Sequence, residues 1–176
     1  KRFWGRVNVH AATALLHFEK GNKVQQLVHE LKYNGRDDVG VHLGEMLGKQ
    51  LLLVDEYNDV AVVVPVPLHW RKKLKRGYNQ SACFADGIAK AMGTQASTEL
   101  LQRARHTQTQ TKKTREERWL NVKDVFVLNR PEQYKGKHIL LVDDVVTTGA
   151  TLEACAQKLL LIPGAKVSIA TIAVAD

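Results

Sequence analysis

The sequence predicts an α/β protein in which a Rossmann-like parallel sheet is flanked by helices. Two short runs, 60–66 and 139–142, are apolar on both faces, as the central strands of a parallel sheet are. Segments of helical periodicity separate the strands, and this alternation is typical of βαβ units. The chain has 176 residues, of which 44% are apolar, so its length and composition suit one domain with a core of ordinary size.

The predicted elements follow one another in the order that such a sheet requires. A strand is expected at 11–18, a helix from Val24 to a stop near Asn34-Gly35, and a helix over about 37–53. The strand at 60–66 precedes a helix at about 78–92, and short strands are expected at 98–104 and 125–128. After the strand 138–144, a helix over 150–161 stops at Pro163-Gly164 and a last strand covers 166–174.

Charge and composition restrict the classes of partner. The net charge is +8 and the pI is about 9.6, which favours polyanionic partners, and the basic residues gather at 71–76 and 103–118. No apolar run approaches the roughly 20 residues that span a bilayer, so we expect no membrane insertion and a cytoplasmic location. The two cysteines, Cys83 and Cys155, are far apart in predicted helices and are expected to be free thiols.

The segment 139–151, ILLVDDVVTTGAT, carries the clearest chemistry. Asp143 and Asp144 follow a buried strand, at the end of the sheet where ligands of parallel sheets bind. Two carboxylates can accept hydrogen bonds from adjacent ribose hydroxyls and keep Mg²⁺ nearby. The following turn opens a helix and could cradle a 5-phosphate with its backbone N–H groups. Its residues are Val146, Thr147, Thr148, Gly149, Ala150 and Thr151. The alternative is a plain strand end followed by a helix with a threonine N-cap.

This segment resembles the phosphoribosyl pyrophosphate (PRPP) motif of type I phosphoribosyltransferases. Three further stretches, 31–33, 64–81 and 107–122, resemble the ComF family of bacteria in the same order. The resemblance covers most of the chain and implies a type I phosphoribosyltransferase fold over 1–176. It also implies a small N-terminal hood at about 1–35 and an α/β core at 36–176.

The resemblance assigns two further segments of the site. A pyrophosphate loop would contain Pro67, Leu68, His69, Arg71, Lys72 and Lys73, and its cations suit a multiply charged anion. We expect some of these cations to face solvent. A flexible loop closing over PRPP would contain Gln110, Lys112, Lys113, Arg115 and Arg118. The alternative for this second segment is a basic surface loop.

Two departures from the family patterns limit what the resemblance implies. ComF proteins often begin with a four-cysteine zinc ribbon, and residues 1–176 contain two cysteines and no such ribbon. Enzymes that act on 6-oxopurines place an acidic base where this chain has Thr147, which disfavours that substrate class. The sequence therefore identifies no catalytic base.

Two functions remain open at this stage. The first is a PRPP-binding phosphoribosyltransferase-like protein that transfers, or once transferred, phosphoribosyl to a nitrogen acceptor with release of pyrophosphate, assisted by Mg²⁺. The second is a non-catalytic component of natural competence and DNA uptake. That component would handle single-stranded DNA, associate with competence proteins and use the PRPP site for ligand binding.

Overall fold

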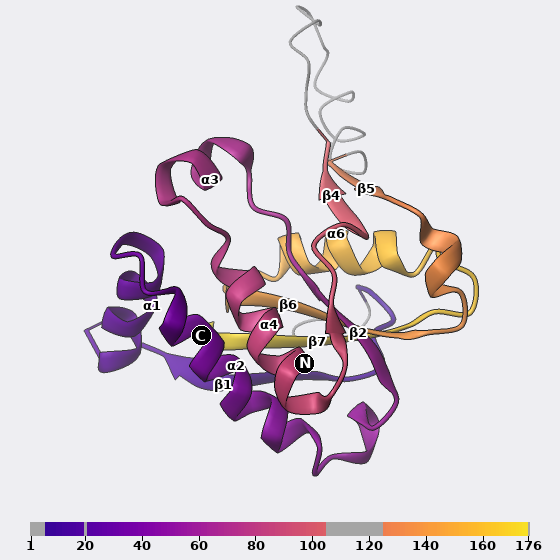
Figure 1. The fold of residues 1–176 in the computed structure, drawn as a ribbon, viewed down its shortest axis with the longest axis horizontal. Coiled ribbons are helices and arrows are strands. Elements are labelled where there is room, and N and C mark those ends of the chain that lie inside the picture. The colour runs from indigo at the N-terminus through magenta and orange to yellow at the C-terminus, as the bar shows by residue number, and fades with distance from the viewer. Residues whose placement is uncertain (1–5, 20, 105–124, 176) are drawn as a thin grey trace, which may run out of the picture.

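The computed structural model describes residues 6–19, 21–104 and 125–175 (Figure 1). In the described chain, five strands form one sheet in the order β1-β7-β6-β2-β3, and every neighbouring pair is parallel. The strands are β1 (Ala12–Phe18), β2 (Val60–Pro65), β3 (Gln95–Ala96), β6 (His138–Val146) and β7 (Lys166–Ala175). The predicted parallel α/β class is therefore confirmed.

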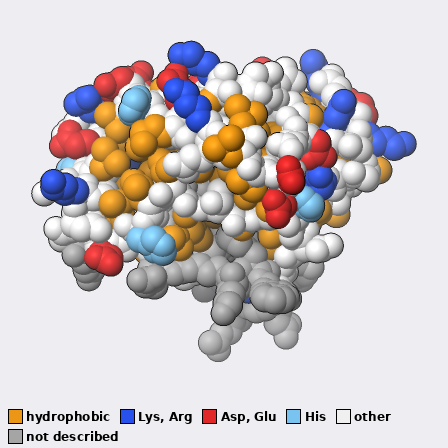
Figure 2. Space-filling model, turned by 90° about the horizontal axis from the view of Figure 1, so that it is seen from below, with side chains coloured by type: hydrophobic (Ala, Val, Ile, Leu, Met, Phe, Trp, Pro, Cys, Tyr) orange, Lys and Arg blue, Asp and Glu red, His pale blue; other side chains and the backbone are white. Residues whose placement is uncertain are grey.

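Helices cover both faces of this sheet, as the apolar runs predicted. In β6, Ile139 and Leu141 pack on one side and Leu140 and Val142 on the other, because successive side chains of a strand alternate between faces. Helix α6 (Ala150–Leu159) packs on the first side. Helices α1 (Lys23–Tyr33), α2 (Asp37–Leu51) and α4 (Gln80–Met92) pack on the second. Figure 2 shows the lower face of the molecule, where apolar side chains lie among charged ones.

Helices α2 and α4 approach each other closely through glycines. A Cβ at Gly44 of α2 would collide with the carbonyl oxygen of Phe84 and would lie 2.9 Å from the Cα of Gly87 in α4. The reciprocal Cβ at Gly87 would collide with the Val41 carbonyl oxygen. Only glycine therefore fits this crossing, which holds α4 close against α2.

The N-terminal segment differs from the predicted hood. Strand β1 pairs with β7 as an edge strand of the main sheet, with Ala12 opposite Ile169 and Phe18 opposite Ala175. Part of the expected hood, 1–35, thus belongs to the core sheet. The physical reason is that β1 supplies the backbone hydrogen bonds that would otherwise be missing along the outer side of β7.

Three of the remaining elements lie at the end of the sheet where the candidate site is found. Helix α3 (Trp70–Arg76) and the antiparallel strands β4 (Leu101–Arg103) and β5 (Phe126–Leu128) project on the same side in Figure 1. The short helices η1 (Asp55–Tyr57) and η2 (Pro131–Tyr134) lie in connections. Helix α3 was predicted as a loop, but the His69 side chain caps it by accepting from the Arg71 N–H, and Gly77 ends it at φ 82°.

Two further predictions concerned membrane insertion and the cysteines, and the helices of the described ranges address both. None of them is both long enough and apolar enough to cross a bilayer. Cys83 and Cys155 are free thiols, as predicted, and Cys155 is buried. Burial raises the pKa of Cys83 to about 11, which keeps this thiol protonated at neutral pH.

Candidate functional site

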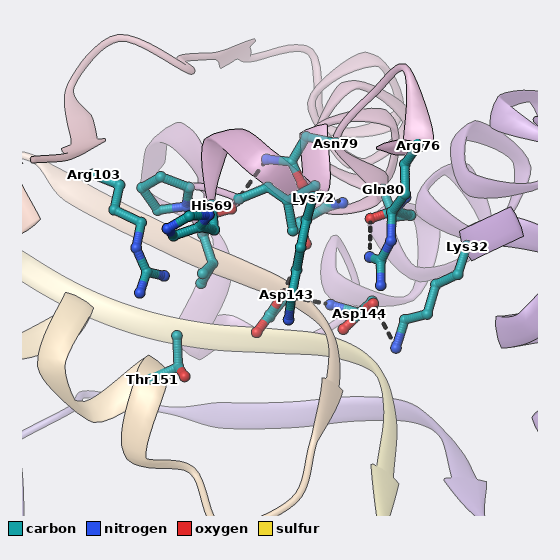
Figure 3. Close-up of a pocket in the computed structure, with 14 residues that line it drawn as sticks. Lys32, His69, Lys72, Arg76, Asn79, Gln80, Arg103, Asp143, Asp144 and Thr151 are labelled. Atoms are coloured by element: carbon teal, nitrogen blue, oxygen red, sulfur yellow. Dashed lines mark hydrogen bonds and ion pairs between the residues drawn. The ribbon is translucent and has the colours of Figure 1, made fainter. Parts of the chain in front are cut away.

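A cavity of about 180 Å³ lies at the carboxyl ends of β2 and β6 (Figure 3). Strand β2 pairs with β6 only as far as Val142, whereas β7 stays paired with β6 up to Val146. The sheet therefore opens at Asp143, between the departing β2 and the continuing β6. The cavity is lined by Lys32, Val66, Pro67, Leu68, His69, Lys72, Arg76, Asn79, Gln80, Ser81, Arg103, Asp143, Asp144 and Thr151.

Asp143 and Asp144, which we call the acid pair, form the floor of this pocket. The Ser81 hydroxyl donates to Asp143 Oδ1 at 2.8 Å, and the backbone N–H of Asp144 donates to the same oxygen at 2.9 Å. Lys32 Nζ lies 2.9 Å from Asp144 Oδ2. The acids were expected where the strand ends, but β6 continues through them to Val146. Three segments thus hold the acid pair in place, namely α1, α4 and β6 itself.

Burial is the main reason why the pKa of Asp143 is raised well above its usual range, and the neighbouring Asp144 raises it further. The hydrogen bonds from Ser81 and from the Asp144 N–H, together with Lys32, act in the opposite direction. Ionising Asp143 is therefore unfavourable until hydroxyl donors or a cation enter the pocket. Such a site is built to receive these groups from a ligand.

The residues present fit Mg²⁺ only if a ligand completes its coordination. No three His, Cys, Asp or Glu side chains in the described part of the chain are grouped to hold a metal. Mg²⁺ commonly binds through one or two carboxylates together with substrate phosphates and water. The acid pair supplies the carboxylates, so a phosphorylated ligand would have to supply the rest.

Four basic side chains from three elements, α1, α3 and β4, form the walls above the acid pair, and we call them the basic wall: Lys32, Lys72, Arg76 and Arg103. Two of them are held by aromatic rings. The Arg76 guanidinium lies 5.4 Å from the centre of the Tyr33 ring, and that of Arg103 lies 5.6 Å from the centre of Phe126. The pocket thus combines hydrogen-bond acceptors on its floor with cations on its walls, which suits a ligand that carries both hydroxyls and phosphates.

The expected pyrophosphate loop is only partly at the cavity. Pro67, Leu68, His69 and Lys72 line it, whereas Arg71 and Lys73 are exposed on α3 and are not among the lining residues. Desolvation lowers the pKa of His69, and the neighbouring Arg103 lowers it further, which favours the neutral imidazole. The expectation that some of these cations face solvent is confirmed.

The expected phosphate turn lies beside the cavity, and of its residues Thr151 lines it. Gly149 has φ 79° and immediately precedes α6. The N–H groups of Thr148 and Gly149 have no hydrogen-bond acceptor within the described ranges, whereas the Thr148 carbonyl accepts from Arg6 at 3.2 Å. The turn thus keeps donors available next to the helix N-terminus, as a phosphate cradle requires.

The expected flexible loop and all its named residues lie outside the described residues: Gln110, Lys112, Lys113, Arg115 and Arg118. Sequence reasoning in turn missed Ser81 as the partner of Asp143 and Lys32 as the partner of Asp144. The start of α4 offered one usable signal. Asn79 is its N-cap, accepting from the Ser81 N–H at 3.2 Å while its Nδ2 donates to the Val66 carbonyl at 3.0 Å.

The comparisons with known proteins agree with this fold. Residues 79–176, more than half of the chain, match the family model "Phosphoribosyl transferase domain". The chain therefore belongs to the phosphoribosyl transferase domain family. Among solved structures, glutamine PRPP amidotransferase from B. subtilis superposes with a TM-score of 0.52 at 22% identity. The superposition covers 81% of this chain and 30% of the amidotransferase chain. This likeness shows the fold alone.

Curated relatives then confirm the resemblance to ComF. The DNA utilization protein YhgH of Salmonella typhi is 35% identical over 137 residues, which is 76% of this chain and 60% of that protein. Competence protein F of Haemophilus influenzae is 31% identical over 98 residues, 55% of this chain and 43% of that protein. Competence protein ComFC of Bacillus subtilis is 33% identical over 99 residues, 56% of this chain and 38% of that protein. The chain thus spans less than two thirds of each relative.

Proposed function

We propose that the pocket binds PRPP together with Mg²⁺ and that the protein transfers the phosphoribosyl group to a nitrogen acceptor, releasing pyrophosphate. One observation carries the proposal: a single cavity places the acid pair below the basic wall. A phosphorylated ribose with a diphosphate presents hydroxyl donors and several anionic oxygens, so it complements both parts. The phosphoribosyl transferase family match supports the same ligand.

The chain's own residues would act mainly by positioning and by charge. The acid pair accepts hydrogen bonds from the ribose diol, and Ser81 and Lys32 hold these carboxylates in place. When bound, Mg²⁺ would neutralise part of the diphosphate charge. During transfer, the bond from the anomeric carbon to the diphosphate oxygen breaks and its electron pair leaves with pyrophosphate. The nitrogen lone pair forms the new bond and the nitrogen releases one proton to water, while the basic wall stabilises the leaving charge.

Binding and transfer are tested in turn on the same protein. Titration calorimetry with PRPP and Mg²⁺ should give binding to wild type and none to the double variant Asp143→Asn/Asp144→Asn. The matched control is Asp55→Asn/Glu56→Gln, which neutralises two adjacent exposed acids of η1 that do not line the pocket. A pyrophosphate-release screen with ammonia, amines and free bases follows. Wild type that does not bind PRPP would refute the proposal, and binding without any release would refute transfer.

Helix α3 favours a second candidate, handling of single-stranded DNA within competence and DNA uptake. Trp70 and Leu74 are 52% and 76% exposed on this helix, among Arg71, Lys72, Lys73 and Lys75. The rings of His69 and Trp70 are stacked with centroids 5.9 Å apart, and the Arg71 guanidinium lies 5.2 Å from the Trp70 ring centre. Exposed aromatic and cationic groups in one place are what unpaired bases and their phosphates bind.

The names of the relatives, DNA utilization and competence proteins, support this second role. Competence proteins would then be the partners, and the cytoplasm, the source of PRPP, would be the compartment. Fluorescence anisotropy with a labelled oligo-dT tests the contact with DNA. Trp70→Ala should weaken binding about tenfold, since a stacked base contributes roughly 1–3 kcal/mol. Leu161→Ala removes another exposed apolar side chain, away from α3, as the control. Equal binding by both variants would refute a role for Trp70.

A further inference from the structure

Gln80, the first residue of α4, has a buried side-chain amide of which only the oxygen makes a hydrogen bond. It is 1% exposed, it lines the pocket, and its Nε2 has no hydrogen-bond partner in the part of the chain that is described. Buried amide donors without an acceptor are rare, because an unmade hydrogen bond leaves the desolvation cost of the group uncompensated. An unpaired donor at a pocket wall therefore points to an acceptor that a ligand brings.

The contact with Arg76 determines which atom of the Gln80 amide is left to donate to a ligand. Its guanidinium donates to Gln80 Oε1 at 2.9 Å (Figure 3). A guanidinium has donors only, so the atom it contacts must be the amide oxygen, and the remaining NH₂ must be a donor. The Tyr33 ring, 5.4 Å from the Arg76 guanidinium, holds that guanidinium in turn. The Gln80 donor is thus oriented before any ligand arrives, which reduces the entropy cost of binding.

We propose that Gln80 Nε2 donates a hydrogen bond to an oxygen of the ligand's diphosphate. This inference rests on the proposed function and assigns a residue outside the segment 67–73 to diphosphate recognition. The two halves of the pocket differ in chemistry. The acid pair only accepts when ionised, so it selects the hydroxyls of a sugar, whereas Gln80 Nε2 and the neighbouring Lys72 and Arg76 only donate. A diphosphate offers acceptors only, and it therefore matches this donating side.

Two variants separate this contact from a packing role. Gln80→Met keeps the length of the side chain but removes the donor, and Gln80→Glu keeps an acceptor for Arg76 while replacing the donor by an anion. Calorimetry is carried out on the full chain with inorganic pyrophosphate and, separately, with ribose 5-phosphate, each with Mg²⁺. Losing a hydrogen bond to a charged group should weaken pyrophosphate binding by about 10-fold to 100-fold. Gln80→Glu should lose more than Gln80→Met, and ribose 5-phosphate binding should be unchanged.

Each other outcome overturns the proposal. Unchanged pyrophosphate binding in both variants shows that Gln80 does not contact the diphosphate. Selective loss of ribose 5-phosphate shows that the contact is to the sugar. Equal loss of both ligands with a lowered melting temperature shows that Gln80 only supports the fold, and the Gln80→Glu variant decides this if Gln80→Met fails to fold. Wild type that binds neither ligand refutes the proposed function itself, which distinguishes that failure from a failure of Gln80 alone.

Discussion

Replacing Asp143 by Asn should stabilise the ligand-free protein at pH 8 and at the same time abolish Mg²⁺-dependent PRPP binding. Burial and the neighbouring Asp144 raise the pKa of Asp143 in the folded state. A raised carboxyl pKa favours folding at pH values below the pKa of the unfolded chain, and this contribution is lost as pH rises through the folded-state pKa. Asn carries no charge and escapes that loss.

The structure sets the size of this gain. The amide oxygen of Asn can still accept from the Ser81 hydroxyl and the Asp144 N–H, which now lie at 2.8 and 2.9 Å from Asp143 Oδ1. The substitution therefore removes mainly the free-energy cost of ionising a buried carboxyl. Each unit by which folding raises the pKa of that carboxyl corresponds to about 1.4 kcal/mol of this cost. Since the hydrogen bonds and Lys32 reduce this cost, we expect a gain in the free energy of unfolding of about 1–3 kcal/mol at pH 8. At pH 3, where the carboxyl is protonated in both states, we expect none.

Urea unfolding with EDTA present measures this difference at both pH values. The control is Asp55→Asn, an exposed acid of η1 whose replacement should change the free energy of unfolding by less than about 0.5 kcal/mol. A gain of equal size at pH 3 and pH 8 would show that ionisation is not the cause. Lower stability of Asp143→Asn at pH 8 would refute the argument, because it would mean that the ionised carboxylate is well solvated or fully paired.

Two further predictions concern the support of the site. Gly44→Ala should lower the free energy of unfolding by about 1–3 kcal/mol, because the added Cβ meets the backbone of α4, which cannot shift without disturbing its packing. Urea unfolding measures this change, with the exposed substitution Gln50→Ala as the control. Wild-type stability of Gly44→Ala would contradict the close contact between the two helices. Ser81→Ala removes a hydrogen bond that lowers the pKa of Asp143, so the pH of half-maximal PRPP binding should move upward. Calorimetry across pH 6–9 measures that midpoint, and an unchanged value would mean that Asp143 does not titrate in this range.

The fold could be predicted largely from the sequence because a strand that is buried on both faces is apolar at every position, and this shows in its own residues. The runs 60–66 and 139–142 are apolar on both faces, and the strands that contain them, β2 and β6, do lie inside the sheet with helices on either side. The acid pair could be placed for the same reason. An acid directly after such a run must lie where a central strand leaves the apolar core, and in a parallel sheet that is where ligands bind.

What the sequence determined by itself, therefore, was the parallel sheet, its helical cover and the position of the acid pair along a buried strand. Only the tertiary structure decided that Lys32 and Ser81 join the pocket, that Arg71 and Lys73 do not line it, and that β1 belongs to the main sheet. Local patterns record how much a segment is buried. They do not record which distant segment packs against it, and the direction of each cation in this pocket depends on that packing.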